Sequence, residues 1–432
     1  MDSQNSEQYK EAVDWLFSRL PMFSRIGAPA YKPGLETTLR LDALYNHPHL
    51  KFKAIHVAGT NGKGSTSHML AAVLQAQGYK TGLYTSPHLT DFRERIRING
   101  EMMPQREVVD FVEGWKRRKP DDLNPSFFEL TMMMAFDFFA RQEVEYAVIE
   151  VGMGGRLDST NIITPLLSII TNISFDHTQF LGNTLEAIAL EKAGIIKRGV
   201  PVVIGEATGE VKDVFERKAA EEGASIIFAQ DSKLSLHKVA DGWKIEFHGN
   251  NITVPLPGSY QRHNIKTVVT SLEELRRIGI GIEDQAVRIG LENVTKLTGL
   301  RGRWQKMGEN PLVICDTGHN VAGLSETMGA LKNLFSGRTL RMVLGFVSDK
   351  DVNHIVDLFP LEGIYYFTRA SIPRAMDEKK VTEIFASKGI RGKEYPSVNE
   401  AYAAAMEEAG SNDVIYVGGS TFIVADFLAS EE

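Results

Sequence analysis

The chain has 432 residues, of which 43% are hydrophobic and 24% charged, and its formal net charge is −7. This length exceeds one typical hydrophobic core, so two domains are expected. The negative charge argues against non-specific nucleic-acid binding, and no apolar run is long enough to cross a bilayer. The first ten residues are polar, unlike a secretory signal. Because Cys315 is a single cysteine and cannot form an intrachain disulfide, a reducing, cytoplasmic location is expected.

Strand and helix patterns alternate through the first half of the chain. A helical pattern covers residues 6–20, and apolar runs typical of strands recur at 54–58, 81–84, 146–151, 166–171 and 200–204. Helical spacing separates most of these runs, as at 129–140 and 185–195, which predicts parallel strands with helical crossovers. Between residues 233 and 257, short alternating strands with Asp241-Gly242 and Gly249-Asn250 as turn signals predict a hairpin or small β meander.

A second alternating series follows Gly302. Strands are predicted at 312–315, 341–346, 363–367 and 414–417, and helices at 321–334, 381–388 and 399–409. This series predicts a smaller doubly wound α/β domain. The boundary is expected within residues 295–302, which divides the chain into domains 1–297 and 298–432. Cys315 lies in an apolar run and fits a small core residue better than a nucleophile.

A glycine-rich loop lies between the strand at 54–58 and a helix predicted to run from Ser65 to Leu74 and stop at Gly78. Its residues are Gly59, Thr60, Asn61, Gly62, Lys63, Gly64 and Ser65. Such a loop lets backbone N–H groups surround phosphate oxygens, while the lysine reaches the outer phosphates and the serine hydroxyl binds Mg²⁺. The spacing departs from the standard motif at Val57 and Gly64, so a glycine-rich turn without a ligand is the alternative. We expect a nucleoside triphosphate here.

Polar residues also follow two other predicted strands. Glu150 ends the strand at 146–151 and precedes a glycine-rich run that finishes at Asp158. Because ligands bind at the carboxyl ends of parallel strands, Glu150 is a candidate cation ligand, with a solvent-facing glutamate as the alternative. Asp176-His177 follows the strand at 169–173; His177 is a candidate second-metal ligand, although by itself a loop-capping pair fits better.

Further candidates lie in loops and at helix ends. Ser86-Pro87-His88-Leu89 precedes Arg93–Ile96 in a predicted loop, and Gln261–Asn264 begins a helix, where its amides could pair with a base or cap the helix. In the second domain, Asp316–Asn320 ends one predicted strand and Asp349–Asp351 follows another. The helical pattern alone gives Lys192 no catalytic role.

The ordered set of these segments resembles the folylpolyglutamate synthase and dihydrofolate synthase family of the Mur ligase superfamily. The resemblance spans nearly the whole chain. The segments that carry it are residues 59–65, 86–89, 94–100, 150–161, 176–178, 191–195, 261–264, 301–304, 316–320 and 349–351. It implies an N-terminal P-loop ATPase domain with a small β meander and a C-terminal Rossmann-like α/β domain. It also implies ATP-dependent addition of L-glutamate to folates, and to dihydropteroate, through an acyl phosphate, with closure of the second domain onto the first.

The resemblance implies roles for individual residues. Lys63 and its loop would hold the phosphates, and Asn264, Arg303 and Asp316 would contact the nucleotide. Two Mg²⁺ ions would be bound by Ser65, Ser86, Glu150, His177 and Lys192, the lysine as a carbamate, and Lys63, Glu150, His177 and Lys192 would form the catalytic set. Substrate contacts would come from Ser86, Pro87, His88, Arg95, Asp158, His319 and Ser420.

Two departures from the family pattern are visible. Thr317-Gly318 stands where the family has Gly-Ala, and Ser159 stands where it has alanine. Two alternatives are a cell-wall precursor ligase, which the loop at 86–96 and Gly64 disfavour, and a P-loop switch ATPase, which the second α/β domain disfavours. We expect a monomer with small-molecule substrates; the preferred folate and any monovalent-cation requirement are left open.

Overall fold

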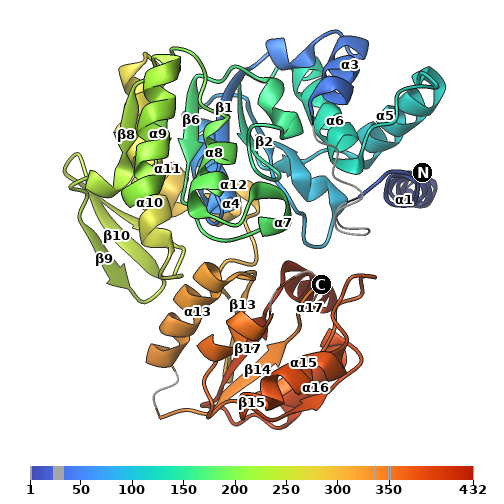
Figure 1. Cartoon of the computed structure of the whole chain (residues 1–432), viewed down its shortest axis with the longest axis vertical. Coiled ribbons are helices and arrows are strands. Elements are labelled where there is room, and N and C mark those ends of the chain that lie inside the picture. Colours follow the sequence, from blue (N-terminus) through green and yellow to red (C-terminus); the bar gives the residue numbers. More distant parts are fainter. Residues whose placement is uncertain (1, 23–33, 335–336, 349, 351, 432) are drawn as a thin grey trace. The chain divides into compact units, whose positions relative to one another are not determined.

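The computed structural model describes residues 2–22, 34–334, 337–348, 350 and 352–431 (Figure 1). The chain divides into two compact units. Unit 1 comprises Met1–Pro255 and Gln261–Leu300, and unit 2 comprises Leu256–Tyr260 and Arg301–Glu432. The short segment Leu256–Tyr260 belongs to unit 2, although it lies within the first of the two continuous domains predicted from the sequence. Those domain bounds, 1–297 and 298–432, remain a proposal.

Unit 1 is built on an eight-stranded sheet in the order β4-β3-β2-β5-β1-β6-β7-β8. The neighbouring strands β2, β5, β1, β6, β7 and β8 pair in parallel, as the alternation predicted. Strands β3 and β4 add an antiparallel edge beside β2 that the pattern did not indicate. The bounds are β1 Lys53–Ala58, β2 Thr81–Tyr84, β3 Ile96–Ile98, β4 Glu101–Met102, β5 Tyr146–Glu150, β6 Leu167–Ile170, β7 Val202–Ile204 and β8 Ile226–Phe228.

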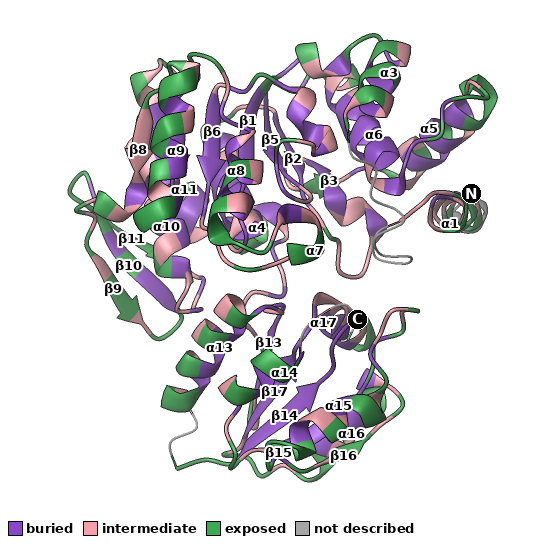
Figure 2. Cartoon of the chain, viewed as in Figure 1, coloured by how far each residue is buried: buried purple, intermediate pink, exposed green. Residues whose placement is uncertain are grey.

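Helices cover both faces of this sheet (Figure 1). The helices of unit 1 are α1 Asp2–Arg19, α3 Glu36–Leu44, α4 Lys63–Ala76, α5 Gln105–Arg118, α6 Phe127–Arg141, α7 Thr178–Leu181, α8 Leu185–Ala193, α9 Gly209–Glu222, α10 Gln261–Arg277, α11 Asp284–Glu292 and α12 Val294–Thr298, with 3₁₀ turns η2 Pro48–Leu50, η3 Phe92–Arg95, η4 Ser159–Ile162 and η5 Ala229–Asp231. Residues 64–74 of α4 are all buried (Figure 2), because α10, α11 and α12 pack on this helix as well as the sheet. This burial explains why residues 64–74 are apolar or small on every side apart from His68, whose Nδ1 lies 2.8 Å from Thr298 Oγ1.

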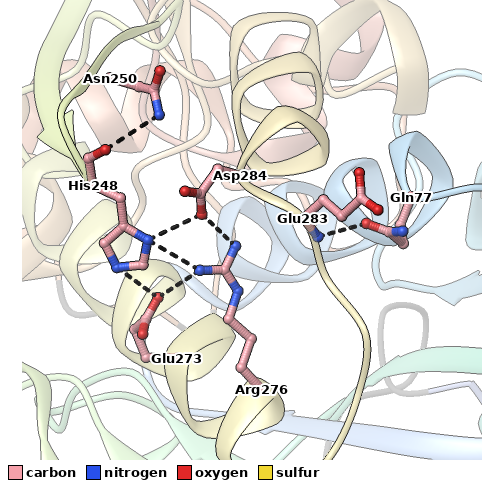
Figure 3. A network of polar contacts seen from close by, with 7 residues as sticks. All are labelled: Gln77, His248, Asn250, Glu273, Arg276, Glu283 and Asp284. Atoms are coloured by element: carbon pink, nitrogen blue, oxygen red, sulfur yellow. Dashed lines mark hydrogen bonds and ion pairs between the residues drawn. The ribbon is translucent and has the colours of Figure 1, made fainter.

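The predicted meander forms a separate three-stranded antiparallel sheet. Its strands are β9 Leu236–Val239, β10 Gly242–Phe247 and β11 Asn250–Val254. The β10–β11 turn uses His248 and Gly249, both with positive φ, as a two-residue hairpin of this type requires. His248 Nδ1 lies 3.0 Å from Asp284 Oδ1, and Arg276 donates to the same oxygen at 2.8 Å, which ties the hairpin to α10 and α11 (Figure 3).

Unit 2 contains a six-stranded sheet in the order β12-β13-β17-β14-β15-β16, parallel except for the edge strand β12. Its elements are β12 Gln305–Glu309, β13 Leu312–Asp316, α13 Val321–Leu334, β14 Leu340–Leu344, α14 Val352–Ile355, η6 Val356–Leu358, β15 Ile364–Phe367, α15 Glu378–Ala386, β16 Gly392–Glu394, α16 Val398–Glu407, β17 Val414–Gly418 and α17 Thr421–Ser430. The predicted α/β fold class is therefore confirmed. Cys315 is fully buried in β13, and burial raises its thiol pKa to about 12, in keeping with a core residue.

Across the described part of the chain, no helix has both the length and the apolar character that a membrane span requires.

Candidate functional site in unit 1

The glycine-rich loop connects β1 to the N-terminus of α4, and two of its glycines have no room for a side chain. Gly59 has a φ of +143° and Gly62 a φ of +82°. A Cβ on Gly59 would lie 1.8 Å from Thr171 Oγ1, and one on Gly62 would lie 2.1 Å from Asn264 Oδ1. Both the backbone conformation and the packing therefore require glycine.

Hydrogen bonds fix this loop to the segment that follows β6. The backbone N–H of Thr60 donates to Asn172 O at 2.9 Å, and that of Asn61 donates to Asn172 Oδ1 at 3.0 Å. Thr171 Oγ1 donates to Asn61 O at 2.6 Å. The loop is thus held in shape before any ligand binds, at the N-terminus of a 14-residue helix where anions are favoured.

Two lysines share one carbonyl of the loop. Lys63 Nζ donates to Gly59 O and Thr60 O, both at 3.1 Å, and Lys192 Nζ donates to Gly59 O at 2.9 Å. Lys192 comes from the end of α8 and is only 4% exposed. Burial, and then the nearby charge of Lys63, lower the pKa of Lys192 to about 7, so much of this amine is neutral at physiological pH.

Glu150 lies beside the loop because β5 and β1 pair in register, with Glu150 opposite Val57. Glu150 is buried, and its Oε2 accepts the backbone N–H of Ser86 at 3.2 Å. The structure therefore brings together two of the predicted metal ligands from segments that are distant in sequence.

Gln261 is a residue that the predicted site set did not include. Its Nε2 donates to Ser65 Oγ at 3.2 Å, and its Oε1 accepts from Asn264 Nδ2 at 2.9 Å. Gln261 therefore joins the predicted nucleotide contact Asn264 to the predicted metal ligand Ser65. The motif 261–264 was a signal for this role, but helix capping explained the same amides equally well.

The loop after β2 places His88 against Arg95. Arg95 Nε donates to His88 Nδ1 at 2.7 Å, and its buried guanidinium lies 5.3 Å from the centre of the Phe127 ring. Burial holds the pKa of His88 well below its usual value, so the neutral ring accepts this hydrogen bond. Pro87 lies on the same loop and is exposed.

Asp158 and His177 have local partners. The buried carboxylate of Asp158 caps η4 and accepts from Met153 N at 2.9 Å and from Thr160 N at 3.0 Å. Burial raises its pKa. His177 precedes α7 with a φ of +50°, and its Nε2 lies 3.9 Å from Asp176 Oδ1. The substrate role of Asp158 and the metal role of His177 stay predictions.

The predicted residues of unit 2 form their own set of contacts. Asp316 Oδ2 accepts from Tyr260 Oη at 2.6 Å and from Trp304 N at 2.8 Å, while Oδ1 accepts from Gly318 N at 2.8 Å. Ser420 caps α17. The Nδ1 atom of His319 contacts the carbonyl oxygen of Thr317, and the guanidinium of Arg303 donates to the carbonyl oxygen of Gly302. Asp349 and Asp351 lie outside the described residues.

Gly62→Ala should weaken nucleotide binding and lower stability. The left-handed backbone alone costs a non-glycine residue about 1–2 kcal/mol, and the added methyl group would displace the Asn264 amide. Urea unfolding and calorimetric titration with ATP would measure the two effects. Gly78→Ala is the matched control, because Gly78 also has a positive φ, +97°, but a Cβ there meets nothing within 4 Å. Equal ATP affinity in both variants would contradict the prediction.

The fold and the loop define a class of protein, which comparison with known families confirms. Residues 57–272 match the model of the Mur ligase middle domain, and residues 302–421 match that of the Mur ligase glutamate ligase domain. The chain is thus an ATP-dependent ligase of the Mur type. A Bacillus subtilis (strain 168) protein named dihydrofolate synthase/folylpolyglutamate synthase is 32% identical, with 97% of this chain and 98% of that protein covered. The chain belongs to the dihydrofolate synthase/folylpolyglutamate synthase family.

Solved structures agree with this assignment. E. coli FolC in complex with DHPP and ADP is 29% identical and superposes with a TM-score of 0.82, covering 97% of both chains. A bifunctional folylpolyglutamate synthase/dihydrofolate synthase with Mn, AMPPNP and L-glutamate bound is 30% identical, with a TM-score of 0.79, covering 93% of this chain and 95% of that one.

Proposed function

We propose that this protein ligates L-glutamate to folates, and to dihydropteroate, at the expense of ATP. The observation that carries the proposal is the preformed loop of residues 59–65, which leads into the N-terminus of α4 and places Lys63 there, beside the paired Glu150 and Ser86. The relatives' bound ADP, AMPPNP and L-glutamate support the same chemistry.

The residues beside the loop fit Mg²⁺. This hard cation takes oxygen ligands, and we propose the Ser65 hydroxyl, the Ser86 hydroxyl and the Glu150 carboxylate, whose Oε2 already accepts from the Ser86 N–H. When bound, Mg²⁺ neutralises charge on the phosphate oxygens. His177 and a carbamate on Lys192 are proposed to complete a second ion site. The bound Mn of a solved relative supports a divalent cation.

The substrate carboxylate has to be activated, since a free carboxylate is a poor electrophile. In the proposed reaction, one of its oxygens attacks the γ-phosphorus of ATP, ADP leaves, and an acyl phosphate forms. The amine of glutamate then attacks the acyl carbon, loses a proton and expels phosphate. Lys63 and the loop N–H groups hold the transferring phosphoryl group in position and stabilise its charge.

A carbamate on Lys192 is consistent with the surroundings of this side chain. The neutral amine attacks the carbon of CO₂ and loses one proton, which leaves an anionic carbamate. Burial at 4% exposure and the lowered pKa both favour the neutral amine that this reaction needs. The modification would convert a cation that competes with a metal ion into a ligand for it.

The remaining predicted contacts belong to the same proposal. Ser86, Pro87, His88, Arg95 and Asp158 are proposed to lie near the pterin-bearing substrate. In unit 2, Arg303 and Asp316 are proposed to contact the nucleotide, and His319 and Ser420 are proposed to contact glutamate. The single cysteine supports the proposed cytoplasmic location.

Product analysis by mass spectrometry tests the proposal. The chain would be incubated with ATP, Mg²⁺ and L-glutamate, with dihydropteroate in one tube and tetrahydrofolate in another. A glutamyl adduct is expected in both tubes, and an adduct in only one would restrict the enzyme to that reaction. ATP consumption without an adduct in either tube would overturn the proposed substrates and favour another ligase or a switch ATPase.

A further inference from the structure

A group of metal-ligating side chains lies outside the site described above, at the end of α3. Asp42 Oδ2 lies 2.6 Å from His47 Nδ1, and Asp42 Oδ1 lies 2.6 Å from His49 Nδ1. The ligand atoms of the three residues all lie within 4.8 Å of one another. We call this group the Asp42 cluster.

The local sequence explains why these side chains meet. His47 N–H donates to Asp42 O, and Asn46 N–H donates to Ala43 O, which is the hydrogen-bond pattern of a Schellman motif. Asn46 has a φ of +60°, the left-handed conformation that this motif needs. The motif brings the second residue after the helix cap back over the last turn, where an apolar contact usually forms; here His47 meets Asp42 instead. Pro48 then begins η2, which carries His49.

The carboxylate of the Asp42 cluster is placed where a cation would be favourable. The Asp42 side chain is 2% exposed, and in the described part of the chain its ion-pair partners are His47 and His49. A cation bound against a buried carboxylate compensates its charge, and the two imidazoles beside Asp42 can share such an ion. His49 is 14% exposed and His47 is 55% exposed, so the group has a route to solvent.

A second histidine–carboxylate group in the same unit shows the contrast. His248 lies between Asp284 and Glu273, but there Arg276 donates to Asp284 Oδ1 at 2.8 Å and to Glu273 Oε1 at 3.2 Å (Figure 3). That guanidinium already supplies the positive charge. The Asp42 cluster has the same kinds of ligand without an arginine among its ion pairs.

We propose that Asp42, His47 and His49 bind one divalent transition-metal ion of the Zn²⁺ class. Two imidazoles and one carboxylate suit zinc, cobalt or ferrous iron, whereas Mg²⁺ and Ca²⁺ prefer oxygen alone. Zinc–nitrogen bonds of about 2.0–2.1 Å place tetrahedral ligands about 3.3 Å apart. The two Asp–His contacts of 2.6 Å would open by less than ~1 Å, and the two ring nitrogens, which lie within 4.8 Å of each other, would settle at the same spacing. Without the ion each ring donates to Asp42 from Nδ1–H. When the ion binds, each Nδ1 gives up that proton to solvent, each neutral ring carries its remaining proton on Nε2, and water completes the coordination.

The ion would have a structural role. It would join the end of α3 to η2, the turn that leads into β1, and β1 ends at the phosphate loop. This site is independent of the proposed ligase reaction, because none of its three residues is assigned to ATP, folate or glutamate.

Zinc titration of the full-length, tag-free protein tests the proposal. After dialysis against a chelator, Zn²⁺ is added in excess Mg²⁺, which occupies oxygen-rich sites, and binding is followed by calorimetry and by the rise in melting temperature. Co²⁺ in place of Zn²⁺ gives visible absorption that reports imidazole ligands. We expect one Zn²⁺ per chain. His47→Ala should weaken binding by more than the ~10–100-fold that loss of an outer-shell partner causes.

His248→Ala is the matched control, since His248 is 47% exposed and also faces carboxylates. It should bind Zn²⁺ as the unaltered chain does. His47 is half-exposed, so His47→Ala is expected to fold, and circular dichroism in chelator checks this. No zinc uptake by the unaltered chain, or equal affinity in the His47→Ala and His248→Ala variants, would overturn the proposal. Neither readout involves ATP, folate or glutamate, so failure here leaves the ligase proposal standing.

Discussion

Lys63→Ala is expected to lower kcat for glutamate ligation by at least ~10³-fold. Removing one neutral hydrogen-bond donor that stabilises a transition-state charge costs about 10²–10³-fold, and Lys63 supplies a full positive charge. Lys63 is the first residue of α4 and stands where the helix N-terminus meets the phosphate loop. Its ammonium group, which contacts two loop carbonyls at 3.1 Å, can turn to the phosphates of ATP. Steady-state kinetics with saturating ATP, folate and glutamate would measure the effect.

Lys51→Ala is the control, because Lys51 is exposed and lies just before β1. It should retain the kcat of the unaltered chain. Since Lys63 also bonds to the loop, thermal unfolding of both variants is needed to separate lost chemistry from lost structure. A folded Lys63→Ala enzyme with near-normal kcat would contradict the phosphate-loop assignment.

Lys192→Ala should be inactive, and short carboxylic acids such as formate or acetate should restore part of the activity. The reason is that alanine leaves a space at the end of α8 which a free carboxylate can fill in place of the carbamate. Ligation rates with increasing acid would measure the rescue, and mild intact-protein mass spectrometry would show the added mass of CO₂ on the unaltered chain.

Lys197→Ala provides the comparison. Lys197 follows the same helix, is also partly buried with a lowered pKa, and donates to Asn161 O at 3.0 Å rather than to the phosphate loop. Acid should not stimulate this variant. Absence of rescue in Lys192→Ala, together with an unmodified lysine in the unaltered chain, would exclude the carbamate.

Most of the parallel strands could be predicted from the sequence because buried strands leave continuous apolar runs. The strand predicted at 81–84 and the helix predicted at 321–334 have the bounds that the structure shows. Elements without such a signal escaped prediction. The edge strand Gln305–Glu309 is polar and mostly exposed or half-buried, and β16 has only three residues.

The site was predictable where neighbouring residues form it, and less so where distant ones do. Residues 59–65 are consecutive, so their loop could be inferred directly. The contact of Glu150 with Ser86 depends on the order of strands in the sheet, and the contact of Gln261 with Ser65 joins residues 196 positions apart. Neither follows from local pattern. Asp158 is a different case: its partners Met153 N and Thr160 N are close in sequence, but the same carboxylate in a glycine-rich motif also fits a substrate contact, so the motif did not distinguish the two.

The shared carbonyl of Gly59 bears on the order in which CO₂ and ATP arrive. Carbamate formation needs a neutral amine, and the ammonium group of Lys63 favours that form of Lys192 while the loop holds no phosphate. Phosphate oxygens at the loop would draw Lys63 away and stabilise the protonated form of Lys192. The proposed carbamate would therefore form most readily before ATP binds, and CO₂ would act as a maturation reagent that prepares the site before its first turnover.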